Sequence, residues 1–345
     1  MTLDLRDPTT APRPRLRAFE RIGLAVVNDP RDLPFVGLCA EITLGLVPLA
    51  ALLYVPHLFR WWLAPIYYAI WGLVFLDRYI LMLHNTSHRR LFNARFALLN
   101  QFIPRVLGPF FGETPDTYFA HHVGMHHVEN NLPGDLSSTM PYQRDSLWDF
   151  LRYYGRFIAV GIVELTAYFR RLGRRELFRR TLWGELLAWA LYGLLAFVDW
   201  RATLVVFVVP LFLARFLMMA GNWGQHAFVA ASDPGSDYLN SISCINTRYN
   251  RRCFNDGYHI GHHVKPTRHW TELPEDLRAN VADYARRGAL VFDGVDFFQV
   301  WLFLMLKRYR ALGRRRVHLG DGPAPSLDET VALLRERTRR FAAHP

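Results

Sequence analysis

Histidines gather in three short stretches of the chain, and their spacing suits metal binding. In the third stretch His259, His262 and His263 stand at positions i, i+3 and i+4, which places three imidazoles on one side of a helix. Imidazole nitrogen is a ligand for iron, zinc and copper. Ten of the 14 histidines lie in these stretches or at position 226. The predicted metal ligands are His84, His88, His122, His126, His127, His226, His259, His262 and His263.

The number of candidate ligands predicts two metal ions. Nine imidazoles would crowd a single ion, which takes at most about six ligands in an octahedral site. Soluble di-iron proteins use carboxylates and Glu-x-x-His pairs on a four-helix bundle. This sequence contains no Glu-x-x-His. A two-metal site in this chain would therefore be held by imidazoles.

The second stretch leaves one assignment open. His122 precedes His126 by four residues, about one helical turn, whereas His121 precedes it by five. We prefer His122 and keep His121 as the alternative. A single His-x-x-x-His pair is common by chance, so the metal hypothesis depends on all three stretches together. His269 is expected to pack beside Trp270 or to contact a ligand, and it is left out of the ligand set.

Acidic residues near the histidines are candidates for orienting them. A metal-bound histidine usually donates its other N–H to a carboxylate or a carbonyl. We expect at least one nearby carboxylate to do this, and we favour Asp256 because it lies three residues before His259. A solvated loop carboxylate is almost as good an explanation. The four candidates are Glu113, Asp116, Asp135 and Asp256.

Four apolar runs predict the elements that position these side chains. A helix needs about 20 residues to cross a bilayer, and the links within each pair of runs are too short for anything but a hairpin. Arg215, near the end of the last run, is expected to extend to the interface. The expected fold is an all-α membrane protein with four transmembrane helices in two hairpins, interfacial helices and a histidine-rich cap. The runs are 35–58, 61–83, 182–198 and 202–220.

Two hairpins would place both termini and every histidine stretch on one side of the membrane. The links on the other side carry only Arg60 and Arg201, so the positive-inside rule predicts that the histidine side is cytoplasmic. The net charge is +11, and the arginines flank apolar runs. This pattern favours an anionic membrane surface and argues against nucleic acid as a partner.

The remaining segments complete the expected organisation of a multi-pass membrane protein. Residues 98–111 are predicted to form an interfacial or re-entrant segment, and residues 147–171 an amphipathic stretch on the membrane surface. The expected divisions are a basic arm over 1–34, a membrane di-iron domain over 35–312 and a basic tail over 313–345. Ser326 and Glu329 form a capping-box pattern that opens a short helix in the tail. His57, His318 and His344 are expected to be solvated.

The three boxes and two hairpins resemble the integral-membrane fatty acid desaturase and hydroxylase superfamily. The resemblance covers about residues 35–275, and residues 84–88 and 259–263 match the first and third histidine boxes. The second box, residues 122–127, has one residue more than the usual His-x-x-His-His. That spacing is similar to the alkane hydroxylases, as are Asp135-Leu-Ser-Ser-Thr-Met and Lys265-Pro-Thr-Arg268.

A further element, Asn222-Trp-Gly-Gln-His226, is similar to the superfamily's Asn-x-x-x-His element. The resemblance implies that His226 binds a metal and that Asn222 supports the site through a metal-bound water. It implies two iron ions (Fe2+/Fe3+) as cofactors and O2 as co-substrate. No haem-binding cytochrome domain and no Cys-x-x-Cys pair of a fused rubredoxin is visible. The expected electron donor is therefore a separate ferredoxin or rubredoxin with a reductase.

The resemblance implies oxidation of an unactivated alkyl chain, and desaturation of a fatty acid or acyl lipid is the expected reaction. The alternatives are terminal hydroxylation of an alkane or fatty acid, and oxidative decarboxylation of a free fatty acid to a terminal alkene. The boxes do not separate these outcomes, because the path of the chain past the metal decides them.

Two other functional classes fit less well. A membrane zinc protease needs His-Glu-x-x-His or its inverse, and neither occurs. A membrane metal transporter would have its site near the bilayer midplane on broken helices. The histidines here lie outside the predicted spans, so transport is kept as the alternative from a different class.

Overall fold

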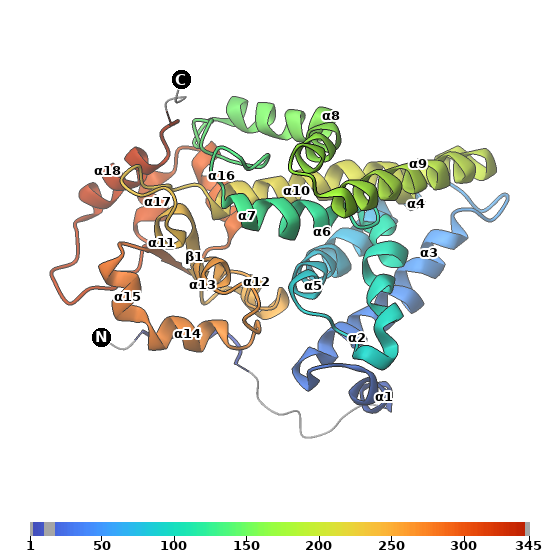
Figure 1. Cartoon of the computed structure of the whole chain (residues 1–345), viewed down its shortest axis with the longest axis horizontal. Helices are drawn as coiled ribbons and strands as arrows, with labels where there is room; N and C mark the ends of the chain where they lie inside the picture. The colour runs from blue at the N-terminus through green and yellow to red at the C-terminus, as the bar shows by residue number, and fades with distance from the viewer. Residues whose placement is uncertain (1–2, 10–17, 342–345) are drawn as a thin grey trace. The chain divides into compact units, whose positions relative to one another are not determined.

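The computed structural model describes residues 3–9 and 18–341, and the described chain is mostly helical (Figure 1). Arg13, Arg15 and Arg17 of the predicted N-terminal arm, together with His344, lie outside the described residues. The chain forms two compact units, which are described separately. Unit 1 comprises Met1–Thr9, Met125–Glu164 and Phe216–Pro345, and unit 2 comprises Thr10–Gly124 and Leu165–Arg215.

Within the described residues, three helical stretches are long and apolar enough to cross a membrane. The first, Pro30–Leu52, contains α2 (Leu33–Glu41) and α3 (Val47–Leu52) joined by a π-type turn. It ends before residue 58, where the sequence had predicted the end of the span. Pro56 lacks an N–H, and the residue before a proline avoids helical backbone angles, so turns replace the helix here.

The second candidate span is one continuous helix, Leu63–His88, made of α4 (Leu63–Ile70), a π-type turn and α5 (Asp77–His88). It continues past the predicted end at residue 83, so the first histidine box lies on the helix itself. The Tyr79 hydroxyl donates to the Ile103 carbonyl at 2.7 Å. This contact fastens the short helical turns of residues 94–111 against α5.

The third candidate span, Arg175–Gln225, is bent back on itself. It contains α9 (Arg175–Thr203), a π-type turn and α10 (Val209–Gln225). Asp199 has extended backbone angles, φ −154° and ψ 107°, and interrupts the helix. The rings of Tyr192 and Phe207 stack with centroids 5.2 Å apart, whereas 15 residues of straight helix would separate them by about 22 Å. The two predicted runs around Asp199 therefore lie side by side.

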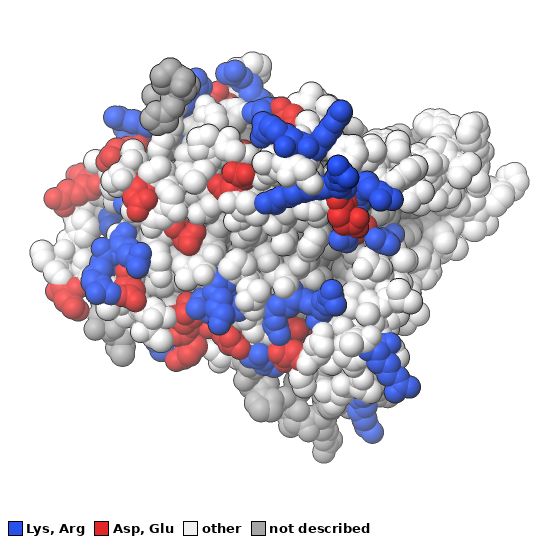
Figure 2. Space-filling view, in the orientation of Figure 1, with Lys and Arg blue, Asp and Glu red and all other residues white. Residues whose placement is uncertain are grey.

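The outer surface of these helices is apolar. Leu194, Phe197 and Val198, near the end of the first limb of the bend, are all exposed. In Figure 2 the charged side chains become sparse where α3 and α9 end. Exposed apolar side chains on long helices are typical of surfaces that contact lipid. The expectation for Arg215 was wrong, because its side chain is buried and its Nη2 lies 3.8 Å from Glu185 Oε1.

Unit 1 contains a feature that the all-α prediction missed. Strands β1 (Ile242–Ile245) and β2 (Leu290–Asp293) form a two-stranded parallel sheet. Ile242 and Leu290 belong to one apolar core and Ile245 and Val291 to another, so the sheet is buried on both faces. A strand buried on both faces has no polar alternation, which explains why the sequence pattern gave no sign of it.

Two predicted local elements are confirmed. Helix α8 spans Leu147–Arg171, the predicted stretch. The Ser326 hydroxyl accepts from the Glu329 N–H and the Glu329 carboxylate accepts from the Ser326 N–H, which completes the capping box of α18 (Leu327–Arg337). The remaining helices are α1 (Ala18–Val26), α6 (Thr117–His121), α7 (His127–Glu129), α11 (Asp237–Asn240), α12 (Arg248–Arg252), α13 (His259–Val264), α14 (Leu273–Ala279), α15 (Val281–Arg286), α16 (Phe297–Met305) and α17 (Tyr309–Gly313).

Candidate metal centre

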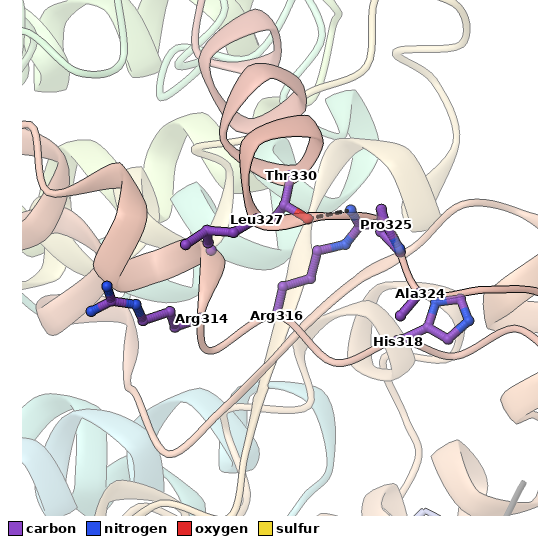
Figure 3. Close-up of a pocket in the computed structure, with 8 residues that line it drawn as sticks. Arg314, Arg316, His318, Ala324, Pro325, Leu327 and Thr330 are labelled. Carbon is purple, nitrogen blue, oxygen red and sulfur yellow. Dashed lines mark hydrogen bonds between the residues drawn. The ribbon is translucent and has the colours of Figure 1, made fainter.

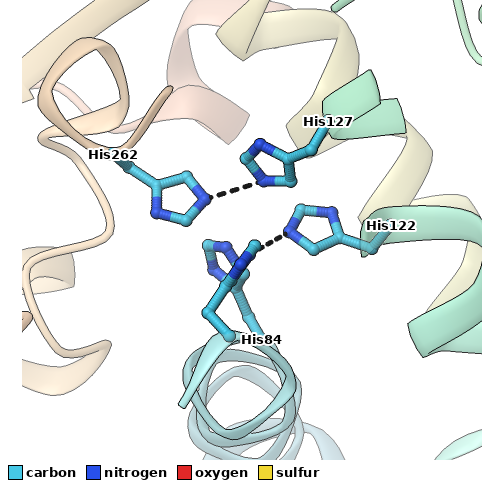
Figure 4. Close-up of side chains that lie close together, drawn as sticks. His84, His122, His127 and His262 are labelled. Atoms are coloured by element: carbon cyan, nitrogen blue, oxygen red, sulfur yellow. Dashed lines mark hydrogen bonds between the residues drawn. The ribbon is translucent and has the colours of Figure 1, made fainter. Parts of the chain in front are cut away.

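Unit 2 brings three predicted ligands together. His84 and His88 lie one turn apart on α5, and His122 follows α6. The Nε2 atoms of His88 and His122 are 3.0 Å apart. One ring nitrogen from each of the three histidines lies within 4.8 Å of the others. Figure 4 shows the rings of His84 and His122 in this cluster.

Unit 1 brings together the other six predicted ligands. One ring nitrogen each of His126, His226 and His263 lies within 4.8 Å of the others. His259 Nε2 lies 3.0 Å from His263 Nε2 and 3.4 Å from His226 Nε2.

A separate pair belongs to the same unit. The Nε2 atoms of His127 and His262 are 3.0 Å apart, and the dashed line in Figure 4 joins their rings. The ring of His127 also lies 4.9 Å from that of His263, measured between centroids.

The distances between facing nitrogens fit ligands of a shared metal ion. Imidazole nitrogen binds such an ion at about 2.1 Å. Two such ligands are about 3.0 Å apart at a right angle and about 3.4 Å apart in a tetrahedral site. The four facing Nε2 pairs measure 3.0, 3.0, 3.0 and 3.4 Å. The donor set of these clusters therefore fits a metal that accepts imidazole.

Hydrogen bonds fix which nitrogen faces the cluster in two cases. His226 Nδ1 lies 2.9 Å from the Asn240 carbonyl, and His126 Nδ1 lies 2.6 Å from Asp135 Oδ2. Because a carbonyl and a carboxylate are acceptors, each Nδ1 carries the proton. The Nε2 lone pair of both rings is then available to a metal, as in other metal sites where an acceptor orients the histidine.

Burial keeps two of these imidazoles in the form that binds metal. It lowers the pKa of His226 to about 4, and the nearby ring of His126 lowers it further. The pKa of His263 is well below its ordinary value for the same reasons, desolvation first and neighbouring histidines second. Both rings are therefore neutral at pH 7, and neutral imidazole is the metal ligand.

Asp135, one of the four predicted candidates, contacts a box histidine. Its Oδ2 accepts from His126 and from the Asn131 N–H at 2.9 Å, and its Oδ1 accepts from the Ser137 hydroxyl at 2.7 Å. Asp256, the favoured candidate, accepts from the Tyr249 hydroxyl at 2.7 Å. The sequence signal for Asp135 was its place in the segment that follows the second box.

The extra residue of the second box lies in a π-type turn. Residues His122–His126 form this turn, in which hydrogen bonds join residues five apart instead of four. A π-type turn therefore accommodates one residue more than an α-helical turn. The extra residue between the histidines of this box is thus accommodated by the π-type turn. His121 ends α6 directly before it, and the ring of Tyr118 stacks on His122 at 5.3 Å.

The side-chain amide nitrogen of Asn222 already donates two hydrogen bonds within the protein. It donates to the Ser137 carbonyl at 3.1 Å and to the Tyr153 hydroxyl at 2.7 Å. Only the amide oxygen can then accept from a bound water. The ring of His269 lies 5.4 Å from that of Trp270, so the expected packing of these two residues is confirmed.

Unit 2 also contains an apolar cavity of about 390 Å³. This volume lies in the range of small-molecule sites, which are mostly apolar. The lining is mostly apolar but includes the charged side chain of Arg105, whose Nη2 pairs with Asp116 Oδ2 at 2.7 Å. An alkyl chain is the kind of ligand that such walls accept. The apolar lining includes Val47, Ala50, Phe110, Leu191 and Phe207.

Comparison with known proteins extends the geometric evidence. The family model described as fatty acid desaturase matches residues 59–294, more than half of the 345 residues. The match includes all three histidine boxes and His226. A search of curated proteins gives no match. The length of the family match, together with the clustered histidines and apolar helices, shows that the chain belongs to the fatty acid desaturase family.

Proposed function

We propose that the protein is a membrane-bound non-haem di-iron oxidoreductase that uses O2 to oxidise an unactivated alkyl chain. Desaturation of a fatty acid or acyl lipid is the reaction we favour. The observation that carries the proposal is the set of imidazole nitrogens facing one another at 3.0 to 3.4 Å. Family membership supports chemistry on lipid substrates.

Nine histidines are the proposed ligands of two iron ions. Bound iron would supply the one-electron and O2 chemistry that side chains lack. The chain's own contribution is to present neutral imidazoles: Asp135 orients His126 and the Asn240 carbonyl orients His226. Asn222 is proposed to hold a metal-bound water through its amide oxygen. The ligands are His84, His88, His122, His126, His127, His226, His259, His262 and His263.

Four membrane crossings follow if both limbs of the bend at Asp199 cross the bilayer. We propose that the boxes and both termini are cytoplasmic, because the opposite links carry few arginines. Reporter fusions at Arg60 and Arg201 should both read as outside the cytoplasm. A cytoplasmic signal at either position would contradict this topology. The predicted divisions at 34/35 and 312/313 are retained as part of this proposal.

The decisive experiment is product analysis by mass spectrometry. The purified protein is incubated with a fatty acid, an acyl thioester or an alkane, with O2, a ferredoxin or rubredoxin and its reductase. Loss of two hydrogens from the substrate indicates desaturation, and gain of one oxygen indicates hydroxylation. Loss of carbon dioxide together with two hydrogens indicates oxidative decarboxylation to a terminal alkene. A product from none of these substrates would argue against the proposed function.

Alanine variants connect the product to the proposed ligands. His226→Ala and His263→Ala should lose both iron and product, because each removes a buried nitrogen from the same cluster. His122→Ala should also lose both, whereas His121→Ala should retain both. Full activity in His122→Ala with none in His121→Ala would reverse the assignment of these two residues. Full activity in His226→Ala or His263→Ala would refute the di-iron assignment. If the wild-type protein transports metal but binds no iron and forms no product, the transporter alternative is favoured.

A further inference from the structure

A second pocket, unrelated to the histidine boxes, lies in the C-terminal part of unit 1. It has a volume of about 220 Å³ (Figure 3). Arg314, Arg316 and His318 contribute the basic side chains of its lining, while Pro325 and Leu327 contribute apolar surface. An isolated bridge pairs Arg316 with Phe292, and His318 Nε2 lies 2.8 Å from the Gly322 carbonyl.

The positive charge of this pocket is not balanced by nearby carboxylates within the described residues. Arg316 Nη1 contacts the Thr330 hydroxyl at 3.4 Å, and neither Arg314 nor Arg316 has an ion pair in the part of the chain that the structure describes. Asp328 Oδ1 is occupied by Arg310 Nη1 at 2.6 Å. A half-buried guanidinium without a carboxylate is costly to desolvate.

A neighbouring guanidinium increases this excess of positive charge. The charge of Arg316 adds to burial in lowering the pKa of Arg337. Burial also lowers the pKa of Arg316 itself. The like charges repel one another, and an anion placed in the pocket would offset both the repulsion and the loss of hydration.

At the N-terminus of α18, the capping box takes up the N–H groups of Ser326 and Glu329, because each side chain accepts from the other residue's backbone. The Glu329 carboxylate is thereby held on the Ser326 N–H at 2.7 Å. Binding would come from the side chains of the pocket, and guanidinium groups match phosphate with paired N–H donors.

We propose that this pocket binds a phosphate group, with Arg316 as its main donor and with the exposed Arg314 and also His318 at its edges (Figure 3). The apolar wall formed by Pro325 and Leu327 leaves room for an organic substituent. The phosphate could be the headgroup of an anionic lipid or a free ion, since both present the same oxygens. The inference is independent of the iron site and of the proposed reaction.

The test measures phosphate binding to the purified full-length protein in detergent by isothermal titration and native mass spectrometry. The probes are inorganic phosphate, dihexanoyl phosphatidic acid and dihexanoyl phosphatidylcholine, whose phosphodiester is shielded by choline. Phosphatidic acid should bind one molecule per chain. Arg316→Gln should raise its Kd at least ten-fold, because it removes the main charged donor. Arg314→Gln should raise it at least three-fold, because it removes a charge at the edge. Arg278→Gln, which removes an exposed arginine of the same unit, should change the Kd less than two-fold.

The outcomes separate the sources of the phosphate. Equal binding of inorganic phosphate and phosphatidic acid supports a free-phosphate site, and binding of phosphatidic acid alone supports a lipid headgroup site. No saturable binding of either probe to the wild-type protein overturns the proposal. An increase in the Kd for phosphatidic acid that is as large in Arg278→Gln as in Arg316→Gln also overturns the proposal. Thermal unfolding of each variant checks that the fold is retained, and Arg314→Gln decides the question if Arg316→Gln unfolds.

Discussion

A neutral imidazole is held facing a metal ion when another group fixes its tautomer and orientation by bonding its second ring nitrogen. In unit 1 the buried carboxylate of Asp135 does this for His126, and three further donors from Asn131 and Ser137 fix the carboxylate. A carboxylate with this many partners is rigid, so it sets the orientation of the ring as well as its tautomer.

Asp135→Asn should weaken metal binding while leaving the fold intact. An amide nitrogen in place of Oδ2 would face the Asn131 N–H, and an amide oxygen there would lose the negative charge. Loss of such an orienting group typically lowers metal affinity by about 10 to 100-fold. Iron retained per chain during titration with a chelator measures the effect. Asp283→Asn, at a partly exposed carboxylate of α15, is the control, and equal iron retention in both variants would contradict the prediction.

Glu113 illustrates the cost of a buried carboxyl group in unit 2. Its side chain is 4% exposed, and Oε1 has no hydrogen-bond partner among the described residues. Burial raises the pKa of Glu113 from 4.5 to about 7, although Arg215 lowers it. The folded protein therefore keeps the proton over a pH range in which the unfolded chain has lost it. Stability should fall as the pH rises from about 4.5 to about 7, and then stay level.

Glu113→Gln should remove this dependence. The neutral amide avoids the ionisation penalty, so the variant should gain up to about 3 kcal/mol relative to the wild type at pH 8 and little at pH 4.5. Thermal unfolding in detergent at the two pH values measures the difference. The same shift in Tm at both pH values would show that packing, rather than ionisation, causes it.

At the scale of elements, the N-terminal segment is fastened to the loop that leads into the third histidine box. Asp7 Oδ2 accepts from the Asn246 N–H at 2.6 Å, from Asn250 Nδ2 at 2.8 Å and from the Tyr258 hydroxyl at 2.8 Å. Tyr258 directly precedes His259. Residues almost 250 positions apart in sequence thus meet around one buried carboxylate, which positions the start of α13.

Asp7→Asn should destabilise this attachment and disturb the third box. Three donors converge on one oxygen, and leaving buried donors poorly paired costs about 1 to 3 kcal/mol. The expected results are a lower Tm and a lower iron content per chain. Asp4→Asn is the control, because the Asp4 side chain is 84% exposed. Equal effects of the two substitutions would mean that the Asp7 carboxylate has no special role.

At the scale of the whole molecule, metal binding and stability should be coupled. A ligand that binds only the folded state stabilises it, by about 2.7 kcal/mol when its concentration is 100 times Kd. Removal of iron with a chelator should therefore lower Tm, and added Fe2+ should restore it at about two ions per chain. The His226→Ala/His263→Ala double variant should show no such recovery. Recovery at one ion per chain would contradict the two-iron assignment.

The sequence by itself determined the features that depend on local chemistry. Long apolar runs predicted the helices that are suited to a membrane, and the amphipathic pattern and the Ser326 cap predicted α8 and α18. Residue type and spacing identified the histidines that cluster within each unit. These properties are readable because helix periodicity, capping and ligand preference act over a few residues.

Only the tertiary structure decided which distant groups meet. It paired β1 with β2, brought Tyr192 and Phe207 together across the bend at Asp199, and placed Asp135 on His126. It also attached Asp7 to the loop before His259. Each of these contacts joins groups whose local sequence pattern does not specify the partner. Their selection depends on packing and desolvation over the whole fold, because a buried polar group is stable only where a partner is present.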